Sequence, residues 1–199
     1  MKILLILLTL LSFQVIAKDQ ADGRYQTATF AGGCFWCMEP PFDKIDGVIS
    51  TTSGYTAGSK KSPTYKEVSA GITGHTEAIA IVFDPKKVSY QELIDVFWKN
   101  IDPYAVDRQF CDAGTQYRSG IYFHDAEQEK LARASLENLK KIKTIDKPIA
   151  TEIEAASTFY PAEDYHQDYY MKNPIRYKYY RYSCGRDQRL EEIWGKNDN

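Results

Sequence analysis

The sequence lacks the features that mark several classes of protein. It has 4 cysteines in 199 residues, too few for a chain stabilised by a dense disulfide framework. Its 25 Lys and Arg stand against 27 Asp and Glu for a net charge of -2, so no positive excess indicates a polyanion-binding protein. It has no internal repeat or Ser/Gly linker, and its 43% hydrophobic content excludes a disordered chain. We therefore expect one globular domain.

Residues 1–17 differ from the rest of the chain. Lys2 supplies a short positive region, residues 3–13 are almost wholly apolar, and Val15 and Ala17 stand at the third and first positions before a cleavage point. This layout is typical of a secretory signal peptide, and the apolar run is shorter than the roughly 20 residues of a membrane-spanning helix. We expect an exported, periplasmic domain over residues 18–199 with no stable membrane insertion after cleavage; an uncleaved anchor is the alternative.

Strand and helix patterns alternate along the chain and predict a two-layer α+β fold. Strands are predicted over 26–31, 48–55, 77–83, 118–123 and 149–156, and helices over 34–39, 89–100 and 125–143. The order β-α-β-β-α-β, followed by α-β, predicts a mixed sheet with a ferredoxin-like split β-α-β core. Pro40 and Pro41 should interrupt the first helix, and residues 159–199 should form an irregular aromatic tail wrapped over the core.

The segment Gly32-Gly33-Cys34-Phe35-Trp36-Cys37 carries the clearest chemistry. A strand ends, two glycines turn the chain, and Cys34 falls at a helix N-terminus, where the helix dipole should lower the pKa of its thiol. Cys37 lies one turn later, close enough to form a disulfide with an oxidised Cys34. A structural disulfide or half a zinc site is the alternative, but the sequence has no second CxxC and no closely spaced His pair, so we predict no metal site.

This segment resembles the GCFW signature of the peptide methionine sulfoxide reductase A family, in its GCFWC branch. Five further segments match the same family in the same order: GYTAG at 54–58, PTYKEV at 63–68, GHTEA at 74–78, GTQYRS at 114–119 and FYPAEDYHQ at 159–167. The resemblance covers roughly residues 26–175. It implies that 18–199 form a single catalytic domain that reduces methionine S-sulfoxide to methionine, both free and in proteins.

The resemblance also implies roles for individual residues. A thiolate at Cys34 attacks the sulfoxide sulfur, while a neutral acid, assigned to Glu67 of the PTYKEV segment, gives a proton to the departing oxygen. Such an acid contributes roughly 10²–10⁴-fold in rate. The hydroxyls of Tyr55 and Tyr117 are expected to hold the sulfoxide oxygen, and Asp112 to orient water or a hydroxyl in the same pocket.

Aromatic residues are expected to enclose the substrate methyl group. The resemblance assigns these walls to Phe35 and Trp36, because aromatic faces accept polarised methyl groups and sulfur well. The three histidines, His75, His124 and His166, are expected to anchor turns through hydrogen bonds rather than to act in catalysis.

Attack should leave Cys34 as a sulfenic acid, which a second thiol must convert to a disulfide. Cys37 is the favoured resolving cysteine, and Cys184 is the next candidate, either directly or as a second relay. Cys111 is expected to be inert or an incidental partner. The disulfide is then reduced by an external thioredoxin-like dithiol, without a bound cofactor. We expect a monomer whose partners are this reductant and proteins containing methionine sulfoxide.

Two other functions fit parts of the sequence. The Cys34/Cys37 pair after a strand suits a general thiol-disulfide oxidoreductase, but the expected Pro preceded by a β-branched residue has no convincing candidate. The interleaved cations and tyrosines of 172–189 resemble a nucleic-acid-binding surface on a module with a structural disulfide. Export and the negative net charge argue against that reading, so we expect no nucleic-acid partner.

Overall fold

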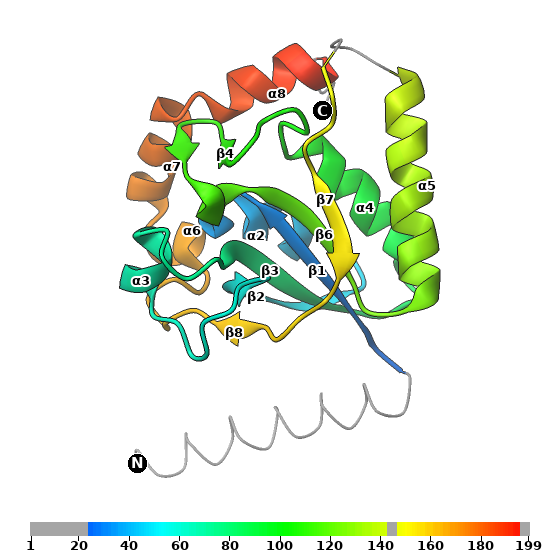
Figure 1. Ribbon diagram of the computed structural model, residues 1–199, viewed down its shortest axis with the longest axis horizontal. Coiled ribbons are helices and arrows are strands. Elements are labelled where there is room, and N and C mark those ends of the chain that lie inside the picture. Colours follow the sequence, from blue (N-terminus) through cyan, green and yellow to red (C-terminus); the bar gives the residue numbers. More distant parts are fainter. Residues whose placement is uncertain (1–23, 143–146, 196–199) are drawn as a thin grey trace.

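The computed structural model describes residues 24–142 and 147–195 (Figure 1). The predicted signal peptide at 1–17 lies outside these ranges. Within them, no helix combines the length and the apolar character needed to cross a bilayer.

The chain alternates strands and helices and then ends in three helices. The strands are β1 (Gln26–Gly32), β2 (Val48–Thr56), β3 (Thr76–Phe83), β4 (Arg108–Gln109), β5 (Asp112–Ala113), β6 (Ser119–Phe123), β7 (Glu152–Ala155) and β8 (Tyr160–Pro161). The helices are α2 (Phe35–Asp43), α3 (Tyr65–Ser69), α4 (Tyr90–Lys99), α5 (Ala126–Ile142), α6 (Tyr169–Lys172), α7 (Pro174–Ser183), α8 (Arg186–Trp194) and a 3-10 turn, η1 (Thr115–Tyr117).

One mixed sheet organises the fold, with the strand order β7-β6-β1-β3-β2-β8. Its four central strands pair antiparallel, and the β1-α2-β2 connection leaves room for β3 between β1 and β2, which is the predicted split β-α-β core. β7 extends the sheet parallel to β6 after α5. The α+β fold with a ferredoxin-like core is therefore confirmed, while β4 and β5 form a separate short hairpin.

The main hydrophobic core fills the space between the sheet and helices α2, α4 and α5 (Figure 1). Phe30 on β1 stacks on Phe42 of α2 and Phe97 of α4, with ring centroids 5.7 and 5.0 Å apart. Alternate residues of β3, Ile79 and Ile81, are fully buried on the same face. These contacts fix the end of β1 and the start of α2 relative to β3.

The turn between β1 and α2 requires glycine at both of its positions. Gly33 has φ +79°, and a Cβ there would lie 2.5 Å from the Cβ of Gln109. The Gln109 side chain cannot give way easily, because it bonds both the N–H and the carbonyl of Asp102, at 2.8 and 2.7 Å. A Cβ on Gly32 would lie 2.6 Å from the sulfur of Met38. The sheet, the β4–β5 hairpin and α2 therefore meet closely around Cys34.

Helix α2 runs through both prolines, contrary to the predicted interruption. Pro40 and Pro41 remove two N–H donors from the helix. The same helix buries Phe35, Met38 and Phe42 in the core, and this burial offsets the lost hydrogen bonds. Tertiary packing thus overrides the local preference.

The C-terminal stretch wraps over the core, as expected, but contains more helix than predicted, in α6, α7 and α8. Its anchor is Arg186, whose side chain is 1% exposed. The guanidinium donates to the carbonyls of Gly32 and Asn100, at 3.2 and 2.6 Å, and its carbon lies 4.3 Å from the ring centroid of Phe110. The start of α8 is thereby fixed to the turn that precedes Cys34.

We predict that Gly33→Ala destabilises the protein more than Gly71→Ala does. Both glycines have φ above +70°, but a Cβ on Gly71 would meet only the Gln116 side chain, at an ordinary 3.5 Å. We expect a loss of about 1–2 kcal/mol for Gly71→Ala from backbone strain, and about 2–4 kcal/mol for Gly33→Ala, where overpacking against Gln109 adds to it. Urea unfolding measures both; equal losses would contradict the close approach to Gln109.

Candidate active site

Cys34 lies at the N-terminal end of α2, and a hydrogen bond joins this end of the helix to the sheet. The N–H of Phe35 donates to a carboxyl oxygen of Glu77 on β3, at 3.1 Å. The N–H of Cys37 donates to the carbonyl of Cys34 at 3.0 Å, closing the first turn. Glu77 and the Cys34 thiol therefore share one buried corner.

Burial dominates the electrostatics of Cys34, whose side chain is 7% exposed. Desolvation raises the pKa of its thiol well above the ordinary value, and Cys37 and the Glu77 carboxylate raise it further. The prediction that the helix N-terminus lowers this pKa is therefore wrong for the substrate-free protein. The N–H group that would favour a thiolate is used by Glu77 instead.

Glu77 is a carboxyl group held in its neutral form. Its side chain is 2% exposed, and burial raises its pKa to about 8, with Asp112 and Cys37 as smaller causes. The hydrogen bond from Phe35 opposes this shift but does not cancel it. At neutral pH most of Glu77 carries a proton beside Cys34.

Three tyrosines and an aspartate complete the surroundings of Cys34. Burial, with Glu77 and Cys34 as smaller causes, raises the pKa of Tyr65 to about 12, so its hydroxyl lies near both groups. Burial and Glu77 also raise the pKa of Tyr117. The hydroxyl of Tyr180, from α7, donates to Asp112 and faces the Cys34 sulfur. Predicted residues Tyr117 and Asp112 are thus brought to Cys34.

Phe35 and Trp36 both lie at this site, on the first turn of α2. Trp36 stacks flat on Tyr169, with centroids 3.6 Å apart and planes 4° apart, and its indole N–H donates to Nδ1 of His166 at 3.0 Å. The Phe35 ring lies 4.9 Å from that of His166. The C-terminal segment therefore sets the orientation of the indole.

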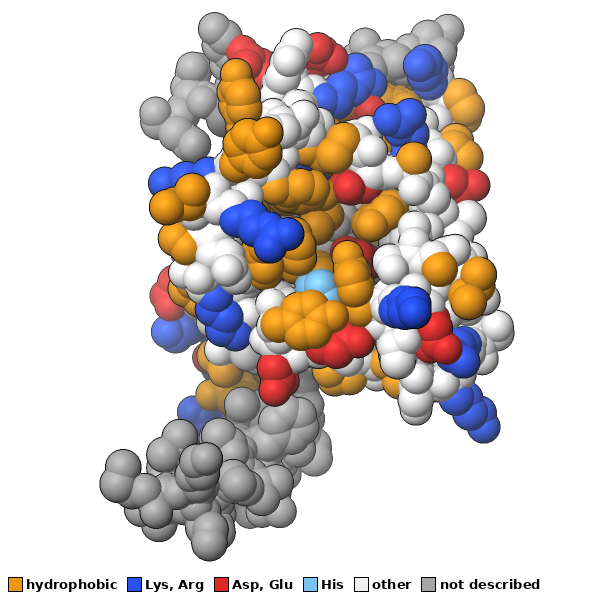
Figure 2. All heavy atoms as spheres, turned by 90° about the vertical axis from the view of Figure 1, so that its left-hand side faces the viewer, with side chains coloured by type: hydrophobic (Ala, Val, Ile, Leu, Met, Phe, Trp, Pro, Cys, Tyr) orange, Lys and Arg blue, Asp and Glu red, His pale blue; other side chains and the backbone are white. Residues whose placement is uncertain are grey.

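Figure 2 shows the face of the molecule formed by α3, α6 and α7, where hydrophobic side chains gather around a hollow with a histidine at its edge. Tyr65 of α3 lies against His166, at 4.3 Å between centroids, and Trp36 meets Tyr180 of α7 edge-on at 5.8 Å. The hollow is thus lined by aromatic rings from three separate parts of the chain.

The structure places Glu67 differently from the prediction. Its carboxylate accepts hydrogen bonds from the N–H and hydroxyl of Thr64, at 3.0 Å each, and pairs with Lys60 at 3.1 Å. These partners lower the pKa of Glu67, so it is ionised at neutral pH. Its position contradicts the prediction of a neutral acid beside Cys34; it caps α3 instead.

Tyr55 is also used differently from the prediction. It is fully buried on β2, and its hydroxyl donates to Glu163 at 2.8 Å. Glu163 also accepts from the N–H of Tyr65, at 2.9 Å. The Tyr55 hydroxyl is therefore not free to hold a sulfoxide oxygen, and its hydrogen bond positions Tyr65 through Glu163.

The sequence analysis missed Glu77 and Tyr65. Both lie inside matched segments, GHTEA and PTYKEV. Membership of a segment did not distinguish them as catalytic candidates from the neighbouring residues. A signal for Glu77 was available: it is a lone carboxyl at the start of the apolar strand 77–83, and a charged residue in a buried strand is a candidate functional group. For Tyr65 the residues alone offered no comparable signal among 15 tyrosines.

Cys37, the favoured resolving cysteine, is a free thiol with a 1% exposed side chain. The hydrogen bond with Cys34 lowers its pKa to about 7 against the effect of burial, and Arg186 and Arg181 add to the lowering. Two cations from the C-terminal segment thus favour a thiolate at Cys37.

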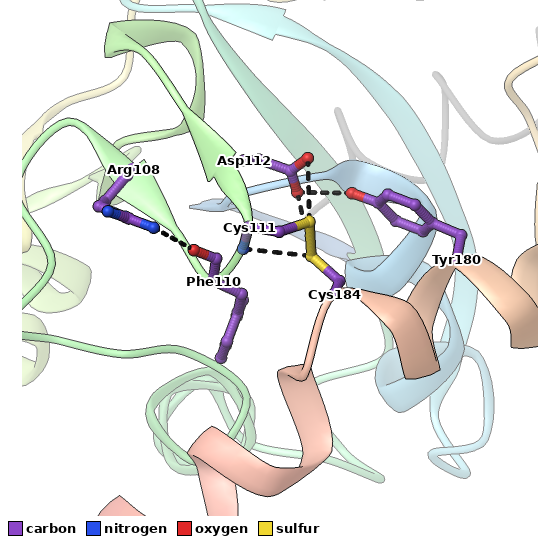
Figure 3. The surroundings of a disulfide bond; sticks show 6 residues. All are labelled: Arg108, Phe110, Cys111, Asp112, Tyr180 and Cys184. Carbon is purple, nitrogen blue, oxygen red and sulfur yellow. Dashed lines mark hydrogen bonds between the residues drawn. A yellow bond between two sulfur atoms is a disulfide. The ribbon is translucent and has the colours of Figure 1, made fainter.

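Cys184, the second candidate, is bonded to Cys111 (Figure 3). The N–H of Cys111 donates to the sulfur of Cys184 at 3.2 Å, and both sulfurs face Asp112, at 3.7 and 4.0 Å. In this state Cys184 has no thiol with which to resolve a sulfenic acid directly. Cys111, expected to be inert or an incidental partner, is its disulfide partner.

We predict that Glu77→Gln gains stability relative to the wild type as the pH rises from about 5 to 8. A carboxyl whose folded-state pKa of about 8 exceeds its unfolded value binds more protons when folded, so wild-type stability falls over this interval. Glutamine does not titrate, and Glu39, with a pKa of about 7, titrates in both proteins. Calorimetric Tm values at several pH values test this. For Glu67→Gln, the control, the difference in Tm from the wild type should be constant above about pH 4.5 and should change only below it, where protonation removes the contribution of the Glu67 carboxylate.

Comparisons with known proteins identify relatives of this chain. The model of the family described as Peptide methionine sulfoxide reductase matches residues 26–198. The Peptide methionine sulfoxide reductase MsrA/MsrB of Vibrio cholerae serotype O1 is 48% identical over 181 residues, 91% of this chain and 48% of that protein. This chain therefore spans about half the length of that relative. The MsrA of Ligilactobacillus salivarius is 51% identical over 168 residues, 84% of this chain and 97% of that protein.

Solved structures share the fold. Methionine sulfoxide reductase A of Corynebacterium diphtheriae superposes with a TM-score of 0.72 at 36% identity, covering 76% of each chain. Mxr1 from Saccharomyces cerevisiae in complex with Trx2 superposes with a TM-score of 0.51 at 27% identity, covering 74% of this chain and 86% of that one. A family match that runs from the first strand through the last helix, with relatives about half identical, establishes that this chain belongs to the peptide methionine sulfoxide reductase family and is an oxidoreductase.

Proposed function

We propose that Cys34 reduces the S epimer of methionine sulfoxide, free and in proteins, by direct attack of its sulfur on the sulfoxide sulfur. The observation that supports this most is the buried pair of Cys34 and Glu77, in which a nucleophile and a neutral acid lie beside each other at neutral pH. Sulfoxide oxygen is a poor leaving group as an oxyanion, so attack needs a proton delivered at the same time.

Glu77 takes the role of that acid, in place of Glu67. Loss of the Cys34 proton while Glu77 keeps its own gives a thiolate beside a carboxylic acid, which is the protonation state that the reaction needs. The thiolate forms the bond to sulfur, Glu77 protonates the oxygen, and the products are methionine, a sulfenic acid on Cys34 and a Glu77 carboxylate. The hydroxyls of Tyr65 and Tyr117 are suited to hold the oxygen, because both lie near Glu77 and Cys34.

The aromatic hollow is suited to bind the S-methyl group of the substrate. Phe35 and Trp36 offer ring faces to a polarised S-methyl group, and His166 and Tyr169 hold the indole in place. Asp112 is suited to bind a polar hydrogen of substrate or water, because its carboxylate oxygens accept hydrogen bonds, as from the Tyr180 hydroxyl. Burial raises the pKa of Asp112, and the hydrogen bond from Tyr180 lowers it.

Cys37 resolves the sulfenic acid. Its thiolate, favoured by Arg186 and Arg181, attacks the Cys34 sulfur and displaces the hydroxyl group, which leaves as water after protonation. An external thioredoxin-like dithiol then reduces the disulfide, and the yeast relative crystallised with Trx2 supports a donor of this type. The cycle written in this way uses only cysteines of the chain and the external dithiol.

We also propose that residues 1–17 are a secretory signal and that the mature protein, residues 18–199, acts as a periplasmic monomer. The positive residue, the apolar run and the small residues before position 18 support this. N-terminal sequencing of protein expressed from the full gene, together with fractionation, tests it. A chain that begins at Met1 and stays with the membrane would favour the uncleaved anchor.

We predict that Cys34→Ser abolishes reduction of an S-sulfoxide peptide and that Glu77→Gln lowers kcat/KM by about 10²–10⁴-fold, the usual contribution of a general acid. Glu67→Gln is the matched control, because it removes a carboxyl from a neighbouring matched segment that caps α3. Its activity should stay within about twofold of the wild type, as for most surface changes. Methionine release with dithiothreitol measures all three. Equal losses in the two glutamine variants would remove the assignment of the acid to Glu77.

A further inference from the structure

The cysteine pair that reacts with substrate is poorly placed for a protein reductant. Cys34 and Cys37 are 7% and 1% exposed, whereas Cys111 is exposed and Cys184 is half-buried. A dithiol must approach a disulfide sulfur closely to attack it, and the reactive cysteine of a folded protein reaches only sulfurs near the surface. The Cys111–Cys184 disulfide meets this requirement; a Cys34–Cys37 disulfide does not.

A surface groove of about 460 Å³ opens beside this disulfide. Its lining includes Val106, Phe110 and Cys184. Val106 exposes 69% of its side chain to solvent. The groove therefore places an exposed apolar side chain, Val106, in the same lining as Cys184, which takes part in the disulfide.

Helix α7 connects this groove to Cys34. Tyr180 and Cys184 are four residues apart, and the N–H of Cys184 donates to the carbonyl of Tyr180 at 2.9 Å, so both side chains lie on one face of the helix. Four residues of α-helix rise about 6 Å. The Tyr180 hydroxyl faces the Cys34 sulfur. Cys184 thus lies one turn from a group in contact with the reacting atom.

The Cys111–Cys184 disulfide ties the end of α7 to the β4–β5 hairpin. None of the residues of α7 is buried, and Ile175, Tyr179 and Tyr182 expose 86%, 73% and 85% of their side chains. Breaking the Cys111–Cys184 bond leaves α7 with the Tyr180–Asp112 hydrogen bond and the edge-on contact of Tyr180 with Trp36, while Arg186 still fixes the start of α8. A helix with so little buried surface opens locally at low cost, which lets Cys184 move towards the Cys34/Cys37 pair.

We propose that the Cys111–Cys184 disulfide is the point at which reducing equivalents enter the enzyme, from a thioredoxin-fold dithiol protein docked in the groove lined by Val106 and Phe110. This inference rests on the proposed function of Cys34. It gives Cys111 a role that neither its motif nor its neighbourhood in the sequence indicated.

The transfer takes two thiol-disulfide exchanges. The two donor thiols reduce Cys111–Cys184, giving the donor disulfide and two thiols on the enzyme. The Cys184 thiolate then attacks the Cys34 sulfur of the Cys34–Cys37 disulfide and releases Cys37. The Cys111 thiolate attacks the Cys184 sulfur of the resulting mixed disulfide and releases Cys34. The products are free Cys34 and Cys37 and a new Cys111–Cys184 disulfide. Two electrons pass from donor to active site, and the two thiol protons pass with them.

The number of substrate molecules reduced without added reductant tests the relay. Fully reduced wild-type protein, freed of dithiothreitol, should release about two methionines per chain, because both cysteine pairs become oxidised. The double variant Cys111→Ser/Cys184→Ser should release about one, since it retains a single pair. One methionine per wild-type chain would overturn the relay, because the second pair would then not communicate with Cys34.

Turnover with a protein donor tests the entry point. With thioredoxin, thioredoxin reductase and NADPH, the ratio of thioredoxin-driven to dithiothreitol-driven rates should fall at least about tenfold in the double variant, because a small dithiol can follow the substrate path to Cys34. An unchanged ratio would overturn the proposal. Absence of methionine in the first turnover of the double variant, or activity of Cys34→Ser, would instead count against the proposed function of Cys34.

Single substitutions test the groove with the disulfide intact. Val106→Asp should raise the KM for thioredoxin about tenfold, because a charge replaces an apolar contact at the centre of the docking surface. Ile49→Asp is the control, because Ile49 is also exposed, at 42%, but lies at the end of the sheet opposite Gly32. It stands at the start of β2 next to Val48, which pairs with Phe83, and Phe83 also pairs with Gln26 at the start of β1. Equal effects of the two substitutions would overturn docking at this groove.

Discussion

The hydrogen bond from the Phe35 N–H to Glu77 is the interaction on which the site depends. It joins the first turn of α2 to a central strand, and it brings a carboxyl group beside Cys34 in a region without solvent. Two acidic groups buried together cannot both ionise easily, so the pKa of each is raised. The same contact therefore positions the reacting groups and keeps one proton available between them.

The sequence predicted the structure best at positions where only one residue type or pattern suits the local conformation. The sheet order follows from the strand and helix pattern, and the two glycines before Cys34 mark the close approach of Met38 to Gly32 and of Gln109 to Gly33. It was least informative about which of several similar groups faces Cys34. Thr64 and Glu67 form a capping box that was readable as a helix start, and this would have removed Glu67 from the candidates. Cys111 and Cys184 are 73 residues apart, and no local pattern pairs them.

The C-terminal segment forms part of the site instead of lying over a finished one. His166 and Tyr169 orient Trp36, Tyr180 reaches Asp112 and Cys34, and Arg186 favours a thiolate on Cys37. A prediction based on β1, α2 and β2 alone reaches only Cys34 and its neighbours on α2, because the other groups come from α3, β3, residues 112–117 and the chain beyond residue 162. The fold brings these segments together through contacts between aromatic rings. The rings come from residues far apart in the sequence, so the spacing of residues does not predict which rings meet.

The buried Arg186 sets a limit on how this chain can be joined to others. Its guanidinium is held by the carbonyls of Gly32 and Asn100 and by the ring of Phe110, so α8 cannot be removed without leaving these groups unsatisfied inside the protein. A linker to an additional domain therefore has to begin beyond Trp194. A fusion junction or protease site placed between α7 and α8 would cut through the catalytic unit, even though it lies about 150 residues from the nucleophile along the chain.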